Sequence, residues 1–312
     1  MRRGMKKTYK GQIRWKHFLP VYLMMLPGLA YLITNNYLPM AGMVIAFKDL
    51  DFKKGIWGSD WAGFDNFRFL FSSSDAWVMT RNTLLYNIVF IFLGIIFGVG
   101  TAILLNEIRK KFFLKFFQTM ILIPFLMSWV IVNYLAYTYL SPDTGLVNNA
   151  ILARLGIKPV SWYMQPKYWP FILTFVNVWK SLGFSTVLYY SALIGISPEY
   201  YESASLDGAS RWQQIKNITL PLLKPTIITL LILNLGHIFN SDFGLFYQVT
   251  RNSGILYPTT RTIDVYVYNA LMKNNDYAMS SAASVFQSIV GFITLMIANA
   301  VVRKVSRENA LF

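Results

Sequence analysis

The sequence contains no cysteine and little charge, and both deficits limit what the protein can be. Without cysteine there is no disulfide framework, no thiolate metal site and no cysteine nucleophile. Charged residues make up 14% of the 312 residues and hydrophobic residues 55%, whereas an ordinary soluble domain has about 25% charged residues. A membrane protein is therefore the expected class.

Motifs that would let the chain power transport or catalyse a reaction by itself are also missing. No G-x-x-x-x-G-K-[ST] phosphate loop occurs, so we expect no ATP site in this chain. A proton relay needs carboxylates or histidines at membrane depth, and only Asp242 and His237 fall inside the predicted spans. Paired carboxylates, metal-spaced histidines and a Ser/His/Asp arrangement are absent. We therefore expect no catalytic residues, no metal ligands and no cofactor in this chain.

Six apolar runs are long enough to cross a bilayer, which takes roughly 20 residues. Backbone groups cannot stay unpaired in hydrocarbon, so runs of this length are expected to be helices. The predicted fold class is an all-α polytopic membrane protein with six transmembrane helices in a single domain. The predicted spans are 18–40, 83–105, 113–140, 169–196, 225–246 and 279–302.

The net charge of +15 does not indicate a nucleic-acid partner, because the basic residues lie between apolar runs rather than on one face or arm. They follow the positive-inside rule instead. Residues 1–17 form a basic segment that we expect in the cytoplasm, followed by the six-helix domain over 18–302 and a cytoplasmic tail over 303–312. Other basic residues expected on the cytoplasmic side are Arg109, Lys110, Lys111, Lys115, Arg211, Lys216, Lys224, Arg303, Lys304 and Arg307.

The polar insert between the fourth and fifth spans, residues 197–225, has a helical pattern of its own. Ser197 is a favourable N-cap, and Pro198 fits the first helical position, where its missing N–H costs nothing. Asp207 and Gly208 are expected to break this helix in a turn. A short helix from about Pro198 to the Asp207-Gly208 turn is therefore predicted on the cytoplasmic side.

A second short helix is predicted over 210–218, with Pro221 and Pro225 ending it and turning the chain into the fifth span. Glu202 and Asp207 offer charges for pairing with another protein. Small side chains at the bend would let that protein come close. They are Ser203, Ala204, Ser205, Gly208 and Ala209.

The spacing Glu202-x-Ala204-x-x-Asp207-Gly208-Ala209, followed by Ile218-x-Leu220-Pro221 and Pro225, resembles the signature loop of permease subunits in binding-protein-dependent ATP-binding-cassette (ABC) importers. The resemblance covers almost the whole chain and is strongest to carbohydrate permeases of the oligosaccharide, alginate-oligosaccharide and maltose types. It implies a type I importer fold in which residues 197–225, the coupling loop, dock onto an ATPase. The residues implied to act in coupling are Glu202, Ala204, Asp207, Gly208, Ala209, Leu220 and Pro221.

Further motifs carry the resemblance to the carbohydrate branch. They are Ile45-Ala46-Phe47-Lys48-Asp49, Gly55-Ile56-Trp57-Gly58, Trp61-Ala62-Gly63-Phe64-Asp65-Asn66-Phe67, Arg81-Asn82-Thr83 and Asp264-Val265-Tyr266-Val267-Tyr268. The partners this resemblance implies are a second homologous permease, two ATPase subunits that bind ATP and Mg²⁺, an extracytoplasmic sugar-binding protein, the lipid bilayer and a carbohydrate substrate, with no nucleic acid. The implied location is the bacterial plasma membrane, where the chain would form half of a pathway for a sugar.

Sugars are bound by amides, hydroxyls and aromatic faces, so polar groups inside the spans are candidates for the pathway. In a continuous fifth helix Asn234, His237 and Ser241 would share one stripe, with Asn240 at its edge. Phe239 and Asn240 also match, by resemblance, a part of the span that contacts sugar in maltose-type permeases. Intramembrane amides also hold helices together, and Trp and Tyr form interfacial belts, so both interpretations stay open. The predicted pathway residues are Asn133, Tyr137, Trp179, Asn234, His237, Phe239 and Asn240.

Lys180 lies inside the fourth predicted span and needs a carboxylate or carbonyl partner there, an acidic sugar being one candidate. The sequence leaves three alternative functions open. They are an ABC importer permease for a non-sugar solute such as an amino acid or polyamine, a self-contained Na⁺-coupled carrier, and a structural or assembly protein of the membrane. It does not identify the sugar or its chain length.

Overall fold

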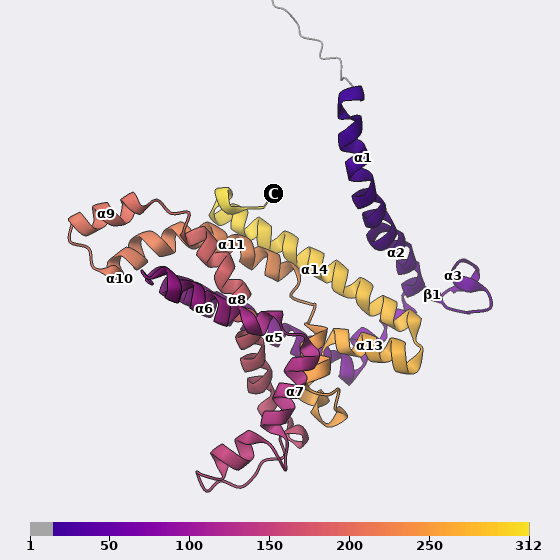
Figure 1. Ribbon diagram of the computed structural model, residues 1–312. Coiled ribbons are helices and arrows are strands. Elements are labelled where there is room, and N and C mark those ends of the chain that lie inside the picture. Colours follow the sequence, from indigo (N-terminus) through magenta and orange to yellow (C-terminus); the bar gives the residue numbers. More distant parts are fainter. Residues whose placement is uncertain (1–14, 312) are drawn as a thin grey trace, which may run out of the picture.

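The computed structural model describes residues 15–311 (Figure 1), so the basic segment predicted over residues 1–17 lies mostly outside it. The helices are α1 (Trp15–Leu32), α2 (Leu38–Met40), α3 (Gly55–Gly58), α4 (Phe69–Ser72), α5 (Ser74–Asn106), α6 (Lys111–Leu126), α7 (Trp129–Leu140), α8 (Trp169–Leu193), α9 (Pro198–Leu206), α10 (Arg211–Gln214), α11 (Leu220–Gly236), α12 (Tyr257–Thr260), α13 (Ile263–Asn274) and α14 (Tyr277–Val305).

Short 3₁₀ and π-helical stretches connect or continue these helices. They are η1 (Ile33–Tyr37), η2 (Ala41–Phe47), η3 (Asp65–Phe67), η4 (Val147–Leu152), η5 (Trp162–Met164), η6 (Pro166–Tyr168), η7 (Ile215–Thr219), η8 (Leu245–Val249), η9 (Gly254–Leu256) and η10 (Arg307–Asn309). The strands β1 (Lys48–Asp49) and β2 (Asp60–Trp61) form an antiparallel pair in which Lys48 is opposite Trp61.

Five helical stretches of the described chain are long and apolar enough to cross a membrane, and the bent pair α6 and α7 makes a sixth. The prediction of an all-α fold with six spans is therefore confirmed. The five unbroken stretches are Phe18–Phe47, Ser74–Asn106, Pro166–Leu193, Arg211–Gly236 and Tyr277–Lys304.

The third span, predicted as one helix over 113–140, is broken. α6 and α7 meet at 95°, because Met127 and Ser128 have extended backbones. Ser128 starts α7 as an N-cap, with its hydroxyl accepting a hydrogen bond from the N–H of Ile131 (3.4 Å). The apolar pattern missed the break because apolar side chains continue across it, although Pro124 and Ser128 are local signals of a helix end and a helix start.

The fifth span is also shorter than predicted, because α11 ends at Gly236 and His237 leaves the helical conformation (φ −103°, ψ 13°). The chain is irregular over 237–242 before it coils again at η8. The predicted helical stripe of Asn234, His237 and Ser241 is therefore wrong. Apolar residues recur beyond Gly236, at Ile238, Phe239, Phe243, Leu245 and Phe246, so hydrophobicity alone extended the helix too far.

The prediction that Pro221 and Pro225 end a short helix is wrong as well, since the helical stretch runs unbroken over Arg211–Gly236. A proline removes one helical hydrogen bond and crowds the preceding turn. Here the wider π-helical turn η7 directly precedes Pro221, and the N–H of Leu220 bonds to the carbonyl of Ile215. The turn that the proline would disturb is therefore already widened.

The helices pack most closely where glycine removes a side chain. A Cβ atom on Gly183 of α8 would overlap the carbonyl oxygen of Ile121 in α6, and a Cβ on Gly98 of α5 would lie 3.0 Å from the ring of Tyr189 in α8. Buried aromatic and aliphatic side chains, including Trp169 and Phe246, fill the interior between α5, α8 and η8. α8 is therefore the central helix, which α5 and α6 both contact.

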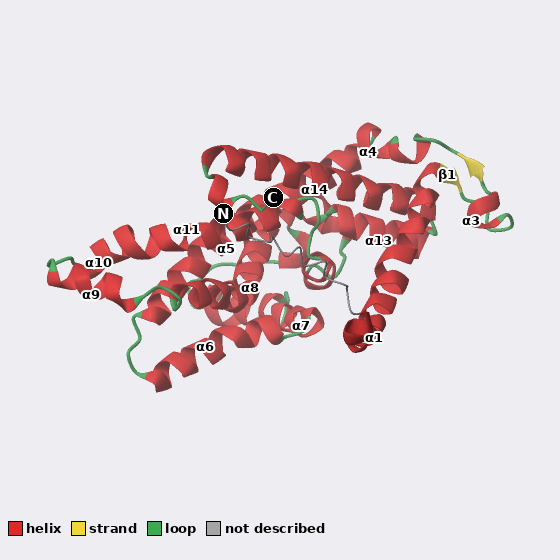
Figure 2. Cartoon of the chain, turned by 90° about the horizontal axis from the view of Figure 1, so that it is seen from above, coloured by secondary structure: helices red, strands yellow, loops and turns green. Residues whose placement is uncertain are grey.

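Two parts extend away from this bundle at opposite ends (Figures 1 and 2). α9 and α10 project together at one end, and the hairpin that carries α3 and β1 projects at the other. α1 stands apart from the remaining spans in Figure 1, and every side chain from Phe18 to Met40 is exposed.

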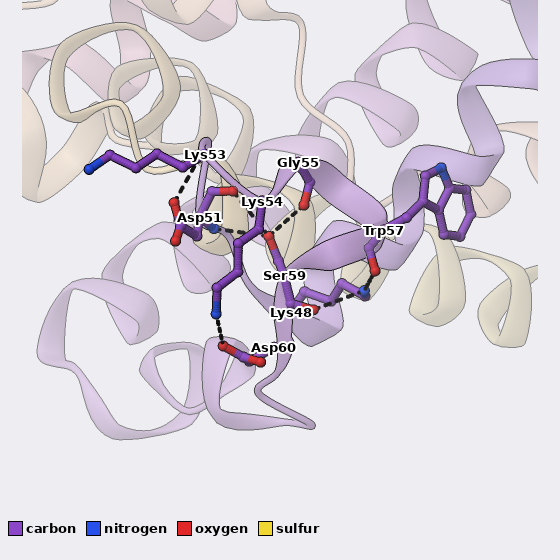
Figure 3. A network of polar contacts seen from close by, with 8 residues as sticks. All are labelled: Lys48, Asp51, Lys53, Lys54, Gly55, Trp57, Ser59 and Asp60. Carbon is purple, nitrogen blue, oxygen red and sulfur yellow. Dashed lines mark hydrogen bonds and ion pairs between the residues drawn. The ribbon is translucent and has the colours of Figure 1, made fainter.

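A polar network stiffens the hairpin (Figure 3). The ammonium group of Lys48 is buried and donates hydrogen bonds to the carbonyl oxygens of Trp57 (2.9 Å) and Ser59 (3.0 Å). At the surface, Lys54 forms an ion pair with Asp60 (2.7 Å). The hydrogen bond and the charge of Lys54 lower the pKa of the Asp60 carboxyl, and Asp60 raises the pKa of Lys54 in return. Both groups therefore stay charged at neutral pH.

Candidate functional site

The coupling loop begins with helix α9, and its turn is built as the sequence indicates. The hydroxyl of Ser197 accepts a hydrogen bond from the N–H of Glu199 (3.4 Å) at the start of α9. Gly208 has φ +79°. The N–H of Gly208 bonds to the carbonyl of Ser205 (3.1 Å), and the N–H of Ala209 bonds to that of Ala204 (2.9 Å). This pair of bonds is the Schellman arrangement that glycine permits at a helix end.

The second helix of the coupling loop is fixed to the first by side chains. Ser210 and Gln213 form a capping box, with bonds of 3.4 Å and 2.7 Å between side chain and backbone. The buried amide of Gln214 donates to the Ser205 hydroxyl (2.9 Å) and to the carbonyl of Ala209 (3.3 Å). The projecting loop therefore holds its shape without a partner in place.

The seven predicted coupling residues occupy two positions. Five of them surround the turn, where Glu202, Asp207 and Gly208 are exposed and Ala204 and Ala209 are partly buried. The other two, Leu220 and Pro221, lie exposed at the start of α11. Two bulky apolar side chains near the turn also face outward, Leu206 at 90% exposure and Trp212 at 70%.

A cavity of about 820 Å³ lies beside α9, between this helix and the C-terminal end of α5. Asn106 and Glu107 line it from α5, and Tyr201 and Glu202 line it from α9. Glu202 thus faces a recess next to the turn as well as the exposed end of the loop.

A second candidate site is the irregular segment 237–242 in the fifth span. Its backbone is held by side chains from other helices. The amide of Asn87 in α5 donates to the carbonyls of Ile238 and Asn240, both at 2.8 Å. Gln287 in α14 donates to the carbonyl of Phe239 (2.7 Å). Irregular backbone at membrane depth persists only where protein or a water-filled cavity satisfies its polar groups, and here side chains of α5 and α14 satisfy them.

Asp264 of α13 fixes the end of the same segment. Its carboxylate accepts hydrogen bonds from the backbone N–H (2.6 Å) and the hydroxyl (2.8 Å) of Ser241, and from the amide of Gln287 (3.2 Å). Asn87 and Gln287 are not among the predicted pathway residues. Both are amides inside predicted spans, so the criterion that selected Asn234 would have found them.

The structure gathers four of the seven predicted pathway residues at the break. Asn234, His237 and Asn240 are exposed there, and within residues 15–311 their side chains have no hydrogen-bond partner. Phe239 is half-buried and packs against Phe286. These three polar side chains therefore do not hold helices of this chain together by hydrogen bonds.

The other three predicted pathway residues lie elsewhere. Asn133 and Tyr137 are on α7, which packs against η8, and the side-chain oxygen of Asn133 is buried with no hydrogen-bond partner among the described residues. Trp179 of α8 is half-buried against the hydrophobic core, as ordinary packing requires.

Lys180 has the carbonyl partners that its buried position demands. Its ammonium group donates to the backbone oxygens of Phe125 (2.8 Å) and Pro124 (3.3 Å), and lies 4.9 Å from the centre of the Trp129 ring. These contacts tie α8 to the last turn of α6, directly beside the break in the third span.

Comparison with known proteins identifies the family to which this chain belongs. Residues 91–307 match the family described as "Binding-protein-dependent transport system inner membrane component". The chain belongs to this family. This membership confirms two predictions, that the chain is a permease and that it is a multi-pass membrane protein.

The sequences of two relatives align with nearly all of this chain. The polygalacturonan/rhamnogalacturonan transport system permease protein YteP of Bacillus subtilis (strain 168) is 37% identical over 295 residues, or 93% of this chain and 89% of YteP. Protein LplB of the same organism is 34% identical over 289 residues, 93% of this chain and 90% of LplB. A chain in the crystal structure of a bacterial ABC transporter involved in the import of the acidic polysaccharide alginate has a TM-score of 0.84 and 34% identity, covering 93% of this chain and 97% of that one.

Proposed function

We propose that the protein is the permease subunit of an ATP-driven importer and forms half of the pathway for an oligosaccharide. The observation that carries this proposal is the likeness in fold, over 93% of the chain, to a permease of an importer for the polysaccharide alginate. YteP, whose name assigns it to polygalacturonan and rhamnogalacturonan transport, supports the same substrate class. The exposed amides and the histidine at the break in the fifth span suit hydroxyl-rich cargo.

The coupling loop would transmit ATP hydrolysis to this pathway. The loop projects beyond the bundle (Figure 2), its internal hydrogen bonds fix its shape, and its exposed tip combines Glu202 and Asp207 with the apolar Leu206 and Trp212. A rigid surface of this kind suits docking into a cleft of an ATPase. The membrane helices would then move when two such ATPases close on ATP.

A second permease would complete the pathway and cover α1. Residues Phe18 to Met40 bury no side chain against the rest of the chain, although this stretch includes the polar Asn35 and Asn36 in a span that faces apolar surroundings. A neighbouring subunit would supply packing that this chain does not. An extracytoplasmic sugar-binding protein would deliver the cargo at the end opposite the coupling loop.

The proposed topology follows from the position of the coupling loop. If α9 and α10 meet ATPases, their side of the membrane is the cytoplasm, and six spans place both termini there as well. The division into a basic segment 1–17, a membrane domain 18–302 with the coupling loop 197–225, and a tail 303–312 rests on this topology.

Co-purification tests the proposal. The chain is purified in mild detergent from its native membrane, as wild type and as Gly208→Trp, with Gly208→Ala as the matched control. Space around Gly208 is open, but its φ of +79° strains any side chain placed there. Tryptophan and alanine carry the same backbone strain, so only the bulky indole, which would obstruct a docking surface, distinguishes the two variants. We expect an ATPase and a second permease with the wild type and with Gly208→Ala, and selective loss of the ATPase with Gly208→Trp.

The alternative outcomes are distinct. If the chain purifies alone and transports a solute in liposomes without ATP, it is a self-contained carrier and the proposal fails. If the ATPase stays bound to Gly208→Trp, the complex is an importer whose ATPase docks elsewhere.

A further inference from the structure

A basic side chain near the outer end of the pathway lacks the partners that hold Lys180. Lys180 donates to two backbone carbonyls. Arg251, by contrast, is exposed, and the ion pairs among the described residues join Lys54 to Asp60 and Arg261 to Asp75. Within residues 15–311, Arg251 therefore keeps its guanidinium edge free for a ligand.

An aromatic ring fixes the position of that guanidinium group. Its central carbon lies 4.4 Å from the centre of the Tyr137 ring. Tyr163 packs against Tyr137 with ring centres 5.8 Å apart, and its hydroxyl donates to the carbonyl of Val249 (3.3 Å). Stacking restrains the planar group while leaving the N–H donors at its edge available.

The backbone beneath Arg251 is held in a conformation that a side chain rarely adopts. Arg251 has φ +56° and Asn252 has φ +48°, in the left-handed region that favours glycine. The N–H groups of these two residues bond to the carbonyls of Gln248 (2.9 Å) and Tyr247 (3.0 Å). Non-glycine residues persist in this region where their surroundings force them to, and such positions gather at ligand sites.

Side chains lock this turn further. The amide of Asn252 exchanges hydrogen bonds with Asn269 of α13 (2.9 Å and 3.1 Å) and accepts one from the hydroxyl of Tyr257 (3.0 Å). Arg251 thus stands on a rigid base directly after η8, the helical stretch that follows the break in the fifth span. Tyr137, one of the predicted pathway residues, contacts the Arg251 guanidinium group from α7.

We propose that Arg251, stacked on Tyr137, is a subsite at the outer end of the pathway that binds a carboxylate of an acidic oligosaccharide. A guanidinium edge matches a carboxylate in a planar, two-bond geometry that a neutral sugar cannot offer. The inference rests on the proposed import function and names the substrate class of that pathway. It also moves the site for an acidic sugar from Lys180, as the sequence indicated, to Arg251.

The absence of cysteine from the chain gives a direct test. The complete importer, with its partner permease, ATPases and binding protein, is reconstituted in liposomes with wild type or Arg251→Cys. Uptake is measured with trigalacturonate, with an alginate trisaccharide and with neutral maltotriose. Arg251→Cys is then modified with cationic aminoethyl methanethiosulfonate or with anionic sulfonatoethyl methanethiosulfonate, and wild type treated identically controls for cysteines of the partners.

We expect Arg251→Cys to lower uptake of an acidic trisaccharide about tenfold, the effect of losing one charge-assisted pair, and the cationic reagent alone to restore it. Lys158→Gln, which removes an exposed charge from the loop between α7 and α8, is the matched control and should leave uptake unchanged. A merely structural role for Arg251, through its stacking on Tyr137, would lower uptake of neutral maltotriose by the same factor as uptake of the acidic sugars.

Two results with the Arg251→Cys variant would overturn the subsite. One is equal uptake of acidic sugar by Arg251→Cys and wild type, and the other is rescue by both reagents alike. Wild type that imports only maltotriose also rejects it, yet leaves the import function standing. If no sugar stimulates ATP hydrolysis in the wild-type complex, the import function itself fails.

Discussion

The side-chain amide of Gln214 donates a hydrogen bond to the hydroxyl of Ser205 over 2.9 Å, and this bond joins the two helices of the coupling loop across the Gly208 turn. Gln214 is buried although the loop around it is exposed. The loop therefore has a small polar interior of its own, and its exposed surface keeps its shape through that interior.

Removing this bond should weaken coupling without affecting the membrane helices. In Gln214→Ala we expect the affinity of the permease for its ATPase to fall about fivefold, because a hydrogen bond of this kind contributes about 1 kcal/mol to holding the loop in its docking shape. Binding of the purified ATPase to permease in detergent measures it. Lys216→Ala, an exposed neighbour, serves as the control, and equal affinities for the two variants would contradict a pre-shaped loop.

The crossing of α6 and α8 should depend on the absence of a side chain at Gly183. A Cβ at this position would overlap the Ile121 carbonyl oxygen, so Gly183→Ala forces the two backbones apart. We expect the free energy of unfolding to fall by about 1–3 kcal/mol, as overpacking does elsewhere. Gly94→Ala on α5 is the control, since nothing lies within 4 Å of its Cβ position, and it should be neutral or stabilising. Thermal unfolding in detergent compares the two; equal melting temperatures would show that the crossing is looser than described.

Lys180 should behave as a structural residue. In Lys180→Met the backbone oxygen of Phe125 loses its donor, whereas that of Pro124 keeps the N–H of Met127 (3.2 Å). A buried acceptor without a partner costs about 1–3 kcal/mol. We expect a lower melting temperature in detergent, with Lys115→Met on the exposed face of α6 unchanged. Unaltered stability together with reduced sugar uptake would instead make Lys180 a substrate contact.

Local sequence signals predicted the first helix of the coupling loop and its turn, because both are fixed by residues close together in the chain. Ser197 starts α9 and Gly208 ends it, and both act through bonds within a few residues. Pro221 misled the prediction, since the π-helical turn η7 that accommodates it has no strong sequence pattern. The bend at Ser128 carried a weak N-cap signal inside a continuous apolar run.

The break in the fifth span could not be predicted from its own residues. Segment 237–242 leaves the helix because Asn87, Asp264 and Gln287 satisfy its backbone from three other helices. Those contacts join residues about 20 to 150 positions apart, which no local pattern records. Hydrophobicity identified the span, and tertiary hydrogen bonds decided where its helix ends.

The same break provides a test that separates a pathway residue from a structural one. The side chain of Asn240 is exposed with no partner within the described chain, whereas the amide of Asn87 holds the carbonyls of Ile238 and Asn240. Asn240→Ala should therefore reduce sugar uptake severalfold while the assembled complex keeps its yield and melting temperature. Asn87→Ala should lower the free energy of unfolding by about 1–3 kcal/mol, since two backbone acceptors lose their donor.

Uptake into liposomes and thermal unfolding of the purified complex are measured on both variants. We expect reduced uptake with an unchanged melting temperature for Asn240→Ala, and a lower melting temperature for Asn87→Ala. If Asn240→Ala unfolds at the lower temperature and Asn87→Ala does not, Asn240 holds helices together. The exposed amides at the break would then be contacts to the second permease rather than to the sugar, because that subunit is the partner proposed to face them across the pathway.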